Sequence, residues 1–360
     1  MERTILLGGV HYARRVAITE NLKGRSMTTR FNKFSKHYLS GLVAMVIGIF
    51  CLTTIAMPLV QDDDTRKLID TSFLQKRPPA SSNHKKTIAK YKRVSPKISE
   101  QLAKVENQSE GKPGDKGENK GEGKGENKGE GKATTAPEIK AGNEVVGLTL
   151  WKLRPALTTD DKSVRMLERE DESTMEWTPV RVDSNTVFAL GDRVRLSFES
   201  PRDGYVYVID RELYADGSMS EPILIFPTMK DYNGNNRVMA GRVIEIPKTS
   251  FKLKTSRADY RGERLSFIVT PEPLLGITIG PRQLQLDNAR VSNWEKDWSV
   301  IAEKWELEDG KGQVYTKAEK EAGQSTTRLL TQDDELPQTI FIIATKPGNP
   351  FLLNLPMKIK

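Results

Sequence analysis

The sequence predicts a mainly β protein: an antiparallel, immunoglobulin-like β-sandwich with two C-terminal helices, preceded by one transmembrane or signal helix and a disordered linker. Three observations predict this organisation. Short apolar runs separated by turn residues recur throughout 144–360. An uncharged apolar stretch of 24 residues occupies 38–61. Between them, 62–143 is rich in Lys, Glu and Gly and poor in apolar residues.

The apolar stretch 38–61 has the length and composition of a membrane helix. A helix of this length spans roughly 36 Å, and the hydrocarbon core of a bilayer is about 30 Å thick. Its flanks are too poor in apolar residues to cover it as a buried core helix. Two interpretations remain: a retained anchor, which the length favours, or a signal peptide cleaved after Ala56 in the small-residue context Thr54-Ile55-Ala56.

The charges beside this stretch predict its orientation. Residues 1–37 carry eight Lys or Arg and two Glu, and a basic segment before an apolar run marks the cytoplasmic side. We therefore expect 1–37 in the cytoplasm, a single pass through the cytoplasmic membrane, and a periplasmic C-terminal domain that is secreted if cleavage occurs. Met27 offers a second start of translation, because the basic-then-apolar order of a signal sequence also begins there.

The linker 62–143 has two parts. Residues 65–104 hold eleven Lys or Arg against two acids, which is typical either of a segment that binds anionic lipid or an anionic polymer, or of a solvated linker. Within 108–132, the octapeptide 117–124 repeats as 125–132. Gly, Glu and Lys at this density bury nothing, so this part is expected to be a flexible spacer.

Basic charge is concentrated outside the predicted domain. The chain has 56 Lys and Arg against 48 Asp and Glu, but residues 141–360 alone hold 30 against 33. A nucleic-acid-binding domain carries its basic charge on the folded part. This distribution therefore excludes nucleic acid and favours membrane topology and anionic surfaces as the reason for the basic residues.

The predicted strands are short and well separated. Val194, Leu196 and Phe198 alternate with polar residues, which predicts a half-buried strand, whereas 205–209 is apolar on both faces and predicts a central strand. Turn residues such as those at 201–204 and 233–234 separate the runs. The remaining predicted strands are 145–153, 223–226, 242–246, 265–270, 339–345 and 351–359.

Two helices are predicted late in the chain. Five apolar residues at helical spacing predict one helix capped by Asp287: Val291, Trp294, Trp298, Ile301 and Trp305. Trp294 and Trp298 are candidates for an aromatic partner-binding face, although packing of the stripe against the sheet is the favoured interpretation. Thr316 and Glu319 form a capping box that opens a short helix, which Gly323 is expected to stop.

The inventory of reactive side chains excludes several chemistries. The three histidines, His11, His37 and His84, all precede the predicted domain, and the single cysteine, Cys51, lies in the apolar stretch. Histidine- or cysteine-based nucleophilic catalysis and common zinc sites are therefore excluded. We expect no catalytic residue, no cofactor and no metal, and neither a Walker loop nor a dinucleotide motif is present.

Acidic residues are the remaining candidates. Asp210, Glu212 and Asp216 cluster in a predicted loop after the central strand, and a carboxylate pair can hydrolyse glycosides. A charged turn is the favoured interpretation, with partner binding as the alternative. The spacing of Asp231, Asn233 and Asn235 resembles the start of a calcium loop but lacks its later Gly and Glu, so a polar turn is the better interpretation.

An ordered set of motifs resembles a bacterial domain of unknown function, numbered 4384. The motifs fall within 185–275, about a quarter of the chain. They are Gly191-Asp192, Gly204-Tyr205-Val206-Tyr207-Val208, Ile225-Phe226-Pro227, Ala240-Gly241 with Ile246-Pro247, and Gly262-Glu263. The resemblance implies an accessory module of envelope and signalling proteins, and it brings no catalytic residues.

The sequence therefore predicts a membrane-anchored envelope module without catalysis. Its partners are the membrane, through one helix, and an envelope protein or an anionic polymer outside the cytoplasm. Two alternatives stay open. One is a carboxylate-based hydrolase that acts on cell-wall glycan, and the other is a purely structural tether.

Overall fold

A computed structural model describes residues 69–79, 90–97, 101, 143–170, 173–255, 257–324, 328–346 and 348–360. All of them belong to one compact unit, Met57–Lys360. The predicted membrane segment 38–61, the cleavage site at Ala56 and the repeat within 108–132 lie outside the described residues. Among the residues that are described, no helix is both long and apolar enough to cross a membrane.

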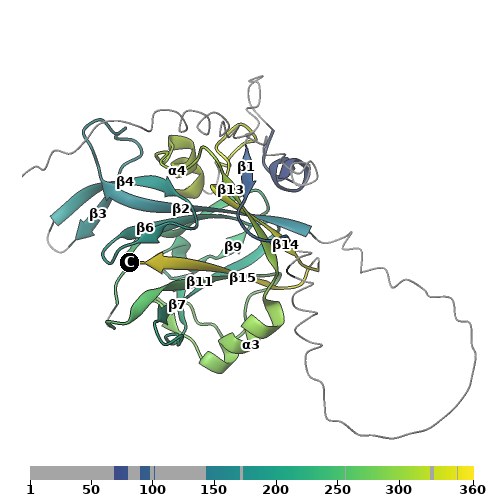
Figure 1. Cartoon of the computed structure of the whole chain (residues 1–360). Coiled ribbons are helices and arrows are strands. Elements are labelled where there is room, and N and C mark those ends of the chain that lie inside the picture. The colour runs from purple at the N-terminus through teal and green to yellow at the C-terminus, as the bar shows by residue number, and fades with distance from the viewer. Residues whose placement is uncertain are drawn as a thin grey trace, which may run out of the picture. The chain divides into compact units, whose positions relative to one another are not determined.

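The protein is mainly β, and the first of its two sheets, sheet A, has eight strands (Figure 1). The long strand β2 pairs with β14 and then β4 along one edge, and with β6 along the other. The strands of sheet A are β1 (Tyr91–Arg93), β13 (Ala302–Leu307), β14 (Thr339–Ala344), β2 (Asn143–Pro155), β4 (Ser173–Val182), β3 (Met166–Glu170), β6 (Arg193–Glu199) and β10 (Val243–Lys252).

The second sheet, sheet B, has seven strands centred on β7 and β11. All its pairs are antiparallel except β15 with β5. Its strands are β12 (Leu284–Gln285), β8 (Ile223–Phe226), β7 (Gly204–Tyr214), β11 (Tyr260–Thr270), β15 (Phe351–Ile359), β5 (Val187–Phe188) and β9 (Arg237–Val238).

Both sheets contribute to one hydrophobic core. Leu148 and Phe198 from sheet A, and Val208 and Phe267 from sheet B, are almost completely buried in the same cluster. The rings of Phe198 and Phe267 stack with their centroids 5.4 Å apart. Period-two alternation along each strand puts these side chains on one face and leaves the other face of each sheet to be covered separately.

Helices cover those other faces. Helix α3 (Asn288–Trp298) lies against sheet B and α4 (Lys317–Gln324) against sheet A (Figure 1). Three short helices complete the described elements: η1 (Ile69–Phe73), η2 (Leu74–Lys76) and η3 (Tyr232–Gly234).

The strand predictions agree with the structure in position but not always in environment. Strands β8 and β15 have the predicted bounds, and the predicted central strand 205–209 lies in β7, between β8 and β11, with 206–209 buried. The prediction that β6 is half-buried is wrong, because all seven of its residues are buried. Its polar side chains face a covered layer rather than water.

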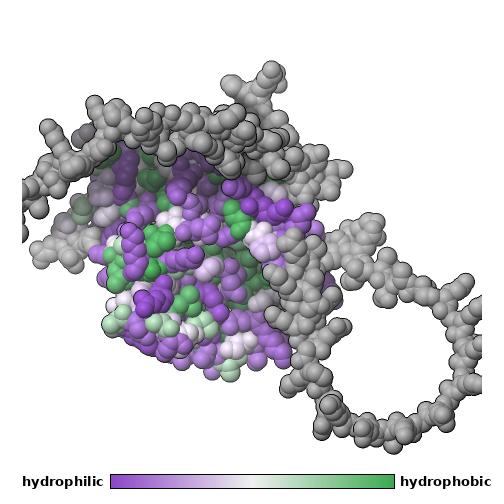
Figure 2. Space-filling model, viewed as in Figure 1, coloured by the Kyte–Doolittle hydropathy of each residue, from purple (hydrophilic) through white to green (hydrophobic). Residues whose placement is uncertain are grey.

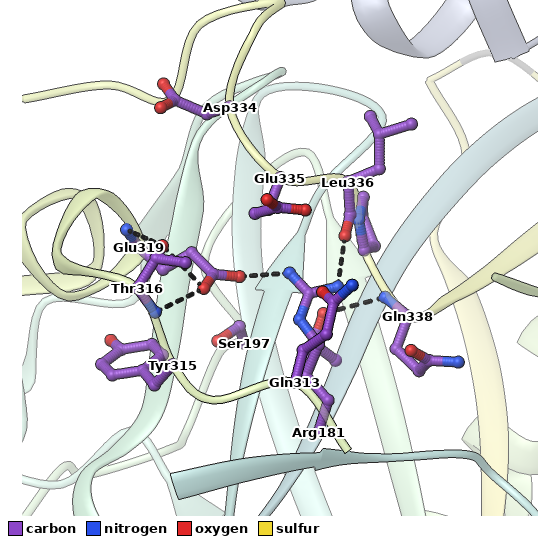
Figure 3. Close-up of polar contacts among 12 residues, drawn as sticks. Arg181, Ser197, Gln313, Tyr315, Thr316, Glu319, Asp334, Glu335, Leu336 and Gln338 are labelled. Carbon is purple, nitrogen blue, oxygen red and sulfur yellow. Dashed lines mark hydrogen bonds and ion pairs between the residues drawn. The ribbon is translucent and has the colours of Figure 1, made fainter. Parts of the chain in front are cut away.

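That covered layer, which we call the arginine layer, consists of four buried Arg–Glu ion pairs on the outer side of sheet A. The Arg195 guanidinium pairs with Glu245, and both side chains are fully buried. Tyr315 donates a hydrogen bond to the same carboxylate at 2.8 Å. The other three pairs are Arg181 with Glu319, Arg193 with Glu168 and Arg77 with Glu199. Figure 3 shows the Arg181–Glu319 pair and the second hydrogen bond of Arg181, to the carbonyl of Leu336.

Two segments from the predicted linker are part of this packing. Residues 69–79 place Phe73 and Leu74 in a cluster with Trp305. Arg77 Nη2 lies 2.5 Å from Glu199 Oε1, and its side chain is fully buried. Strand β1 pairs with β13, and the side-chain amide of Gln101 donates to the carbonyl of Ala302 at 3.0 Å. The chain between Gln101 and Asn143 therefore starts and ends on sheet A.

The helix predictions are confirmed at their N-termini. Asp287 caps α3 by accepting a hydrogen bond from the backbone N–H of Arg290 at 2.7 Å. The prediction that one helical stripe runs to Trp305 is wrong, because α3 ends at Trp298 and Trp305 belongs to β13. Ser299 has an extended backbone that ends the helix, and Trp305 packs in a different cluster from Val291 and Trp294.

The capping box of α4 is present, and Gly323 has a role beyond ending the helix. Thr316 Oγ1 accepts from the Glu319 N–H at 3.2 Å and donates to the Glu319 carboxylate at 2.8 Å. A Cβ atom on Gly323 would lie 2.2 Å from Cγ of Glu245. Only glycine lets α4 approach the arginine layer this closely, although the helix does end one residue later, at Gln324.

Candidate ligand cleft

A cleft of about 820 Å³ lies between β8 of sheet B and β10 of sheet A. Ile223 and Ile225 line one wall, and the stretch 246–254 lines the other. The structure pairs β10 only with β6 among the described strands, and the backbone N–H groups of Glu245 and Lys248 donate instead to the Tyr232 hydroxyl and to Asp231. This volume is typical of ligand sites in proteins.

The bottom of the cleft is formed by three carboxyl groups, which we call the acid floor: Asp210, Glu212 and Glu263. Asp210 and Glu212 lie on β7 and alternate in phase with the core residue Val208. On β11, Glu263 lies directly opposite Glu212 in the register. The acid floor is therefore the continuation of the apolar inner face of sheet B, with acids where the pattern would place core residues.

The acid floor has few donors from the protein. Glu263 is 4% exposed, and its Oε1 accepts a hydrogen bond from the Tyr260 hydroxyl. Glu212 accepts from Thr255 at 2.8 Å and Tyr214 at 3.2 Å. Glu263 Oε2 and Asp210 Oδ1 are buried without a donor. No Lys or Arg of the described chain forms an ion pair with any of the three carboxyl groups.

Burial and like charge shift the titration of this group. Burial, followed by the neighbouring Asp210 charge, raises the pKa of Glu263 to about 9. Burial, with a smaller contribution from Glu212, raises the pKa of Asp210 to about 6. Burial and the hydrogen bond to Glu263 raise the pKa of the Tyr260 hydroxyl. Asp210 and Glu263 are hydrogen-bonded neighbours and burial raises both pKa values, so the pair holds one proton between them at neutral pH.

Basic side chains stand at the opening of the cleft. Lys230, Lys254 and Arg282 are exposed, and we call them the cation rim. Lys248 is half-buried, with its Nζ 4.1 Å from the ring centroid of Tyr232. The cleft therefore offers negative charge at its base and positive charge at its mouth.

The structure separates the three acids that the sequence grouped. Asp210 and Glu212 lie within β7, which continues to Tyr214, so the predicted loop at these positions is wrong. Asp216 is exposed in the following turn, where the Ser218 hydroxyl lowers its pKa, and it lies 3.7 Å from Arg257. Asp216 is not part of the cleft lining.

Glu263 and Tyr260 are site residues that the sequence analysis did not select. The available signal is the alternation along β11, where Glu263 is in phase with Leu265 and Phe267 of the core. An acid at a core-phase position next to a second strand with the same feature is unusual, because like charges on paired strands repel.

The two tryptophans lie elsewhere. Trp294 is 9% exposed and packs on sheet B with Tyr207 and Ile268, and Trp298 is half-buried and stacks on Trp294 with ring centroids 5.5 Å apart. The surface in the region of α3 is hydrophilic with small apolar patches (Figure 2). These side chains pack the helix onto the sheet.

The calcium-like spacing forms a polar turn around η3. Asp231 accepts hydrogen bonds from the Thr228 hydroxyl at 2.8 Å and from the Lys248 N–H at 2.9 Å. Asn235 accepts from the Arg237 N–H at 3.0 Å. These oxygens already accept hydrogen bonds from the protein. Within the described residues, no three His, Cys, Asp or Glu side chains are grouped so as to hold a metal ion.

Residues 187–273 match the family model of a domain of unknown function, DUF4384. The match runs from β5 past β11, so it contains the whole acid floor and both strands that carry it. Strands β2 and β15, which pair with β6 and β11, lie outside it. No curated protein and no solved structure matches the chain.

Proposed function

We propose that the chain is a non-catalytic envelope module, held at the cytoplasmic membrane by 38–61, whose cleft binds an extended segment of a protein or polymer outside the cytoplasm. The observation that supports it most is the cleft itself, with an acid floor, a cation rim and, along one wall, a strand that only β6 pairs with among the described strands. The uncharged stretch 38–61 and its basic N-terminal flank support the location. Two sheets around one core support an immunoglobulin-like sandwich as the architecture.

The shape of the cleft favours an extended ligand. The stretch 246–254 along one wall belongs to an edge strand and the residues that follow it, and edge strands bind extended chains through backbone hydrogen bonds. Between Ile246 and Phe251 the register against β6 shifts, so the intervening residues project from the sheet. An extended segment along this wall would place alternate side chains over the acid floor.

A blocking substitution tests this proposal. Thr249 is exposed and lines the cleft, and Thr159 is exposed in a turn outside it. Full-length chain in detergent micelles would be titrated with three fluorescent dodecapeptides, of alternating Lys/Glu, Lys/Gln and Glu/Gln, and with solubilised peptidoglycan fragments. We expect measurable binding of at least one probe, weakened at least tenfold by Thr249→Trp and unchanged by the control Thr159→Trp. Equal binding by both variants, or no binding of any probe, refutes the proposal.

A second candidate function is supported by the shared proton of Asp210 and Glu263. A carboxyl group that is protonated at neutral pH beside an ionised one is the arrangement that acid–base hydrolases use. The candidate enzyme acts on cell-wall glycan, with Glu263 as acid and Asp210 or Glu212 as base. Release of reducing ends from purified wall glycan by the parent protein, lost in a D210N/E212Q/E263Q variant, would support it. Absence of turnover by the parent rules it out.

A further inference from the structure

The acid floor differs from the other buried carboxylates of the domain in what surrounds it. Glu199, Glu245 and Glu319 each contact an arginine. Glu263 is buried to the same degree, yet its Oε2 has no donor and no basic side chain of the described chain pairs with it. A buried carboxyl group without a cation is costly to ionise, so the fold itself gains nothing from this arrangement.

The unsatisfied atoms converge on one place. Asp210 Oδ1 and Glu263 Oε2 are both buried without a donor, and both residues line the cleft. Glu212 lies opposite Glu263 across the β7–β11 pair and lines the same cleft. The two donorless oxygens thus belong to neighbouring carboxyl groups in the lining of one cleft, with the Glu212 carboxylate close by.

We infer that the acid floor binds the primary ammonium group of a zwitterionic peptide, whose carboxylate lies on the cation rim. This inference rests on the proposed binding function of the cleft. An ammonium group has three N–H donors, enough to satisfy the donorless oxygens of Asp210 and Glu263, and its charge replaces the shared proton. The ligand class is a peptide with a lysine-like or diamino-acid side chain and a free carboxylate within reach of Lys230, Lys254 and Arg282.

Displacement of the shared proton by the ammonium group can be measured separately from binding affinity. The floor holds one proton at neutral pH and takes up a second as the pH falls toward about 6, the pKa of Asp210, and these protons compete with the ammonium group, so affinity should fall as the pH is lowered. Binding at neutral pH should release protons into the buffer. The groups facing the site from the packed elements are Glu212, Asp210 and Glu263 on the floor and Tyr260, Tyr214 and Lys248 beside it.

The experiment compares two peptides that differ in one group. Acetyl-Ala-Lys-Ala with a free carboxylate and its Nε-acetyl-lysine counterpart would be titrated into the full chain by calorimetry at pH 7.5, in two buffers of different ionisation enthalpy. We expect the ammonium peptide to bind at least tenfold more tightly, with proton release. Asp210→Asn and the near-isosteric Glu263→Gln should each remove that preference, whereas the control Asp216→Asn should keep it.

The possible failures are distinguishable. Equal binding of both peptides leaves the cleft as a binding site and overturns the ammonium assignment. The same follows if D210N or E263Q binds the ammonium peptide as tightly as D216N does, provided that the variants unfold cooperatively. If neither tripeptide binds, the ammonium assignment is overturned. If the dodecapeptides and the peptidoglycan fragments also fail to bind, the proposed function is overturned as well.

Discussion

Buried carboxylates occur in two regions of the domain, and they are neutralised in two different ways. In the arginine layer on sheet A, Glu245 accepts from Arg195, Ser197 and Tyr315, so both of its oxygens have donors. In the acid floor of sheet B, Glu263 has one hydroxyl donor and a second carboxyl group as its neighbour. The comparison separates acids that are paired with arginines in the fold from acids that we propose bind a ligand.

Breaking an ion pair of the arginine layer should have the largest effect. Arg195→Met leaves Glu245 buried beneath α4 without its cation, and removal of one partner of a buried pair costs about 3–5 kcal/mol. We expect that loss in the free energy of unfolding, measured by urea denaturation at pH 7.5. A loss below about 1 kcal/mol would show that the layer tolerates a lone carboxylate, and the contrast with the acid floor would then disappear.

Gly323, the glycine of α4 that lies against Glu245, tests the same layer without removing a charge. In Gly323→Ala the new Cβ would overlap Cγ of Glu245, so α4 must move away from sheet A. Overpacking of this kind costs about 1–3 kcal/mol. Gly280→Ala is the matched control, because nothing lies within 4 Å of its Cβ position, and its effect should stay within about 0.5 kcal/mol.

Replacing the ionisable Glu263 of the acid floor should have the opposite effect on stability. The pKa of Glu263 is raised on folding, so its contribution to stability is fully present below its unfolded value near 4.5 and is lost as the pH rises toward about 9. Glu263→Gln removes this pH-dependent loss of stability, because the glutamine side chain does not ionise. At pH 8 we expect the variant to be at least about 1–2 kcal/mol more stable than the parent, and at pH 4 to be equal to it. A destabilised variant at pH 8 would place Glu263 with the structural acids.

The sequence predicted the strands and their core-facing sides but not the arginine layer on the outer side of sheet A. Apolar periodicity located β8, β15 and the inner faces of β6 and β7, because that signal is local. The alternation of Arg195 with apolar residues looks the same whether its partner is water or a glutamate. That partner, Glu245, is fifty residues away, so the burial of the second face depends on contacts that no local pattern contains.

The candidate site was partly predictable for the same reason. Asp210 and Glu212 stood out as close neighbours in the sequence, but Glu263 joins them only through the pairing of β7 with β11. Asp216, equally close in sequence, turns away at the end of β7. Sequence proximity groups acids by position, whereas the sheet groups them by register and by face.

The sequence predicts a third environment for carboxylates, solvated rather than buried, in the repeat within 108–132. Removing this repeat should have the smallest effect on the stability of the domain. Both ends of the segment from Gln101 to Asn143 are fixed on sheet A, so the segment closes a loop of 41 residues. Its composition predicts no pairing, and only its length should matter. Deletion of 108–132 leaves 16 residues and should stabilise the domain by about 0.8 kcal/mol through the lower entropy of loop closure. Because no charge pair is lost, the gain should be the same at 0.05 and 0.5 M salt. A salt-dependent loss of stability would instead show that the repeat binds the domain through its charges.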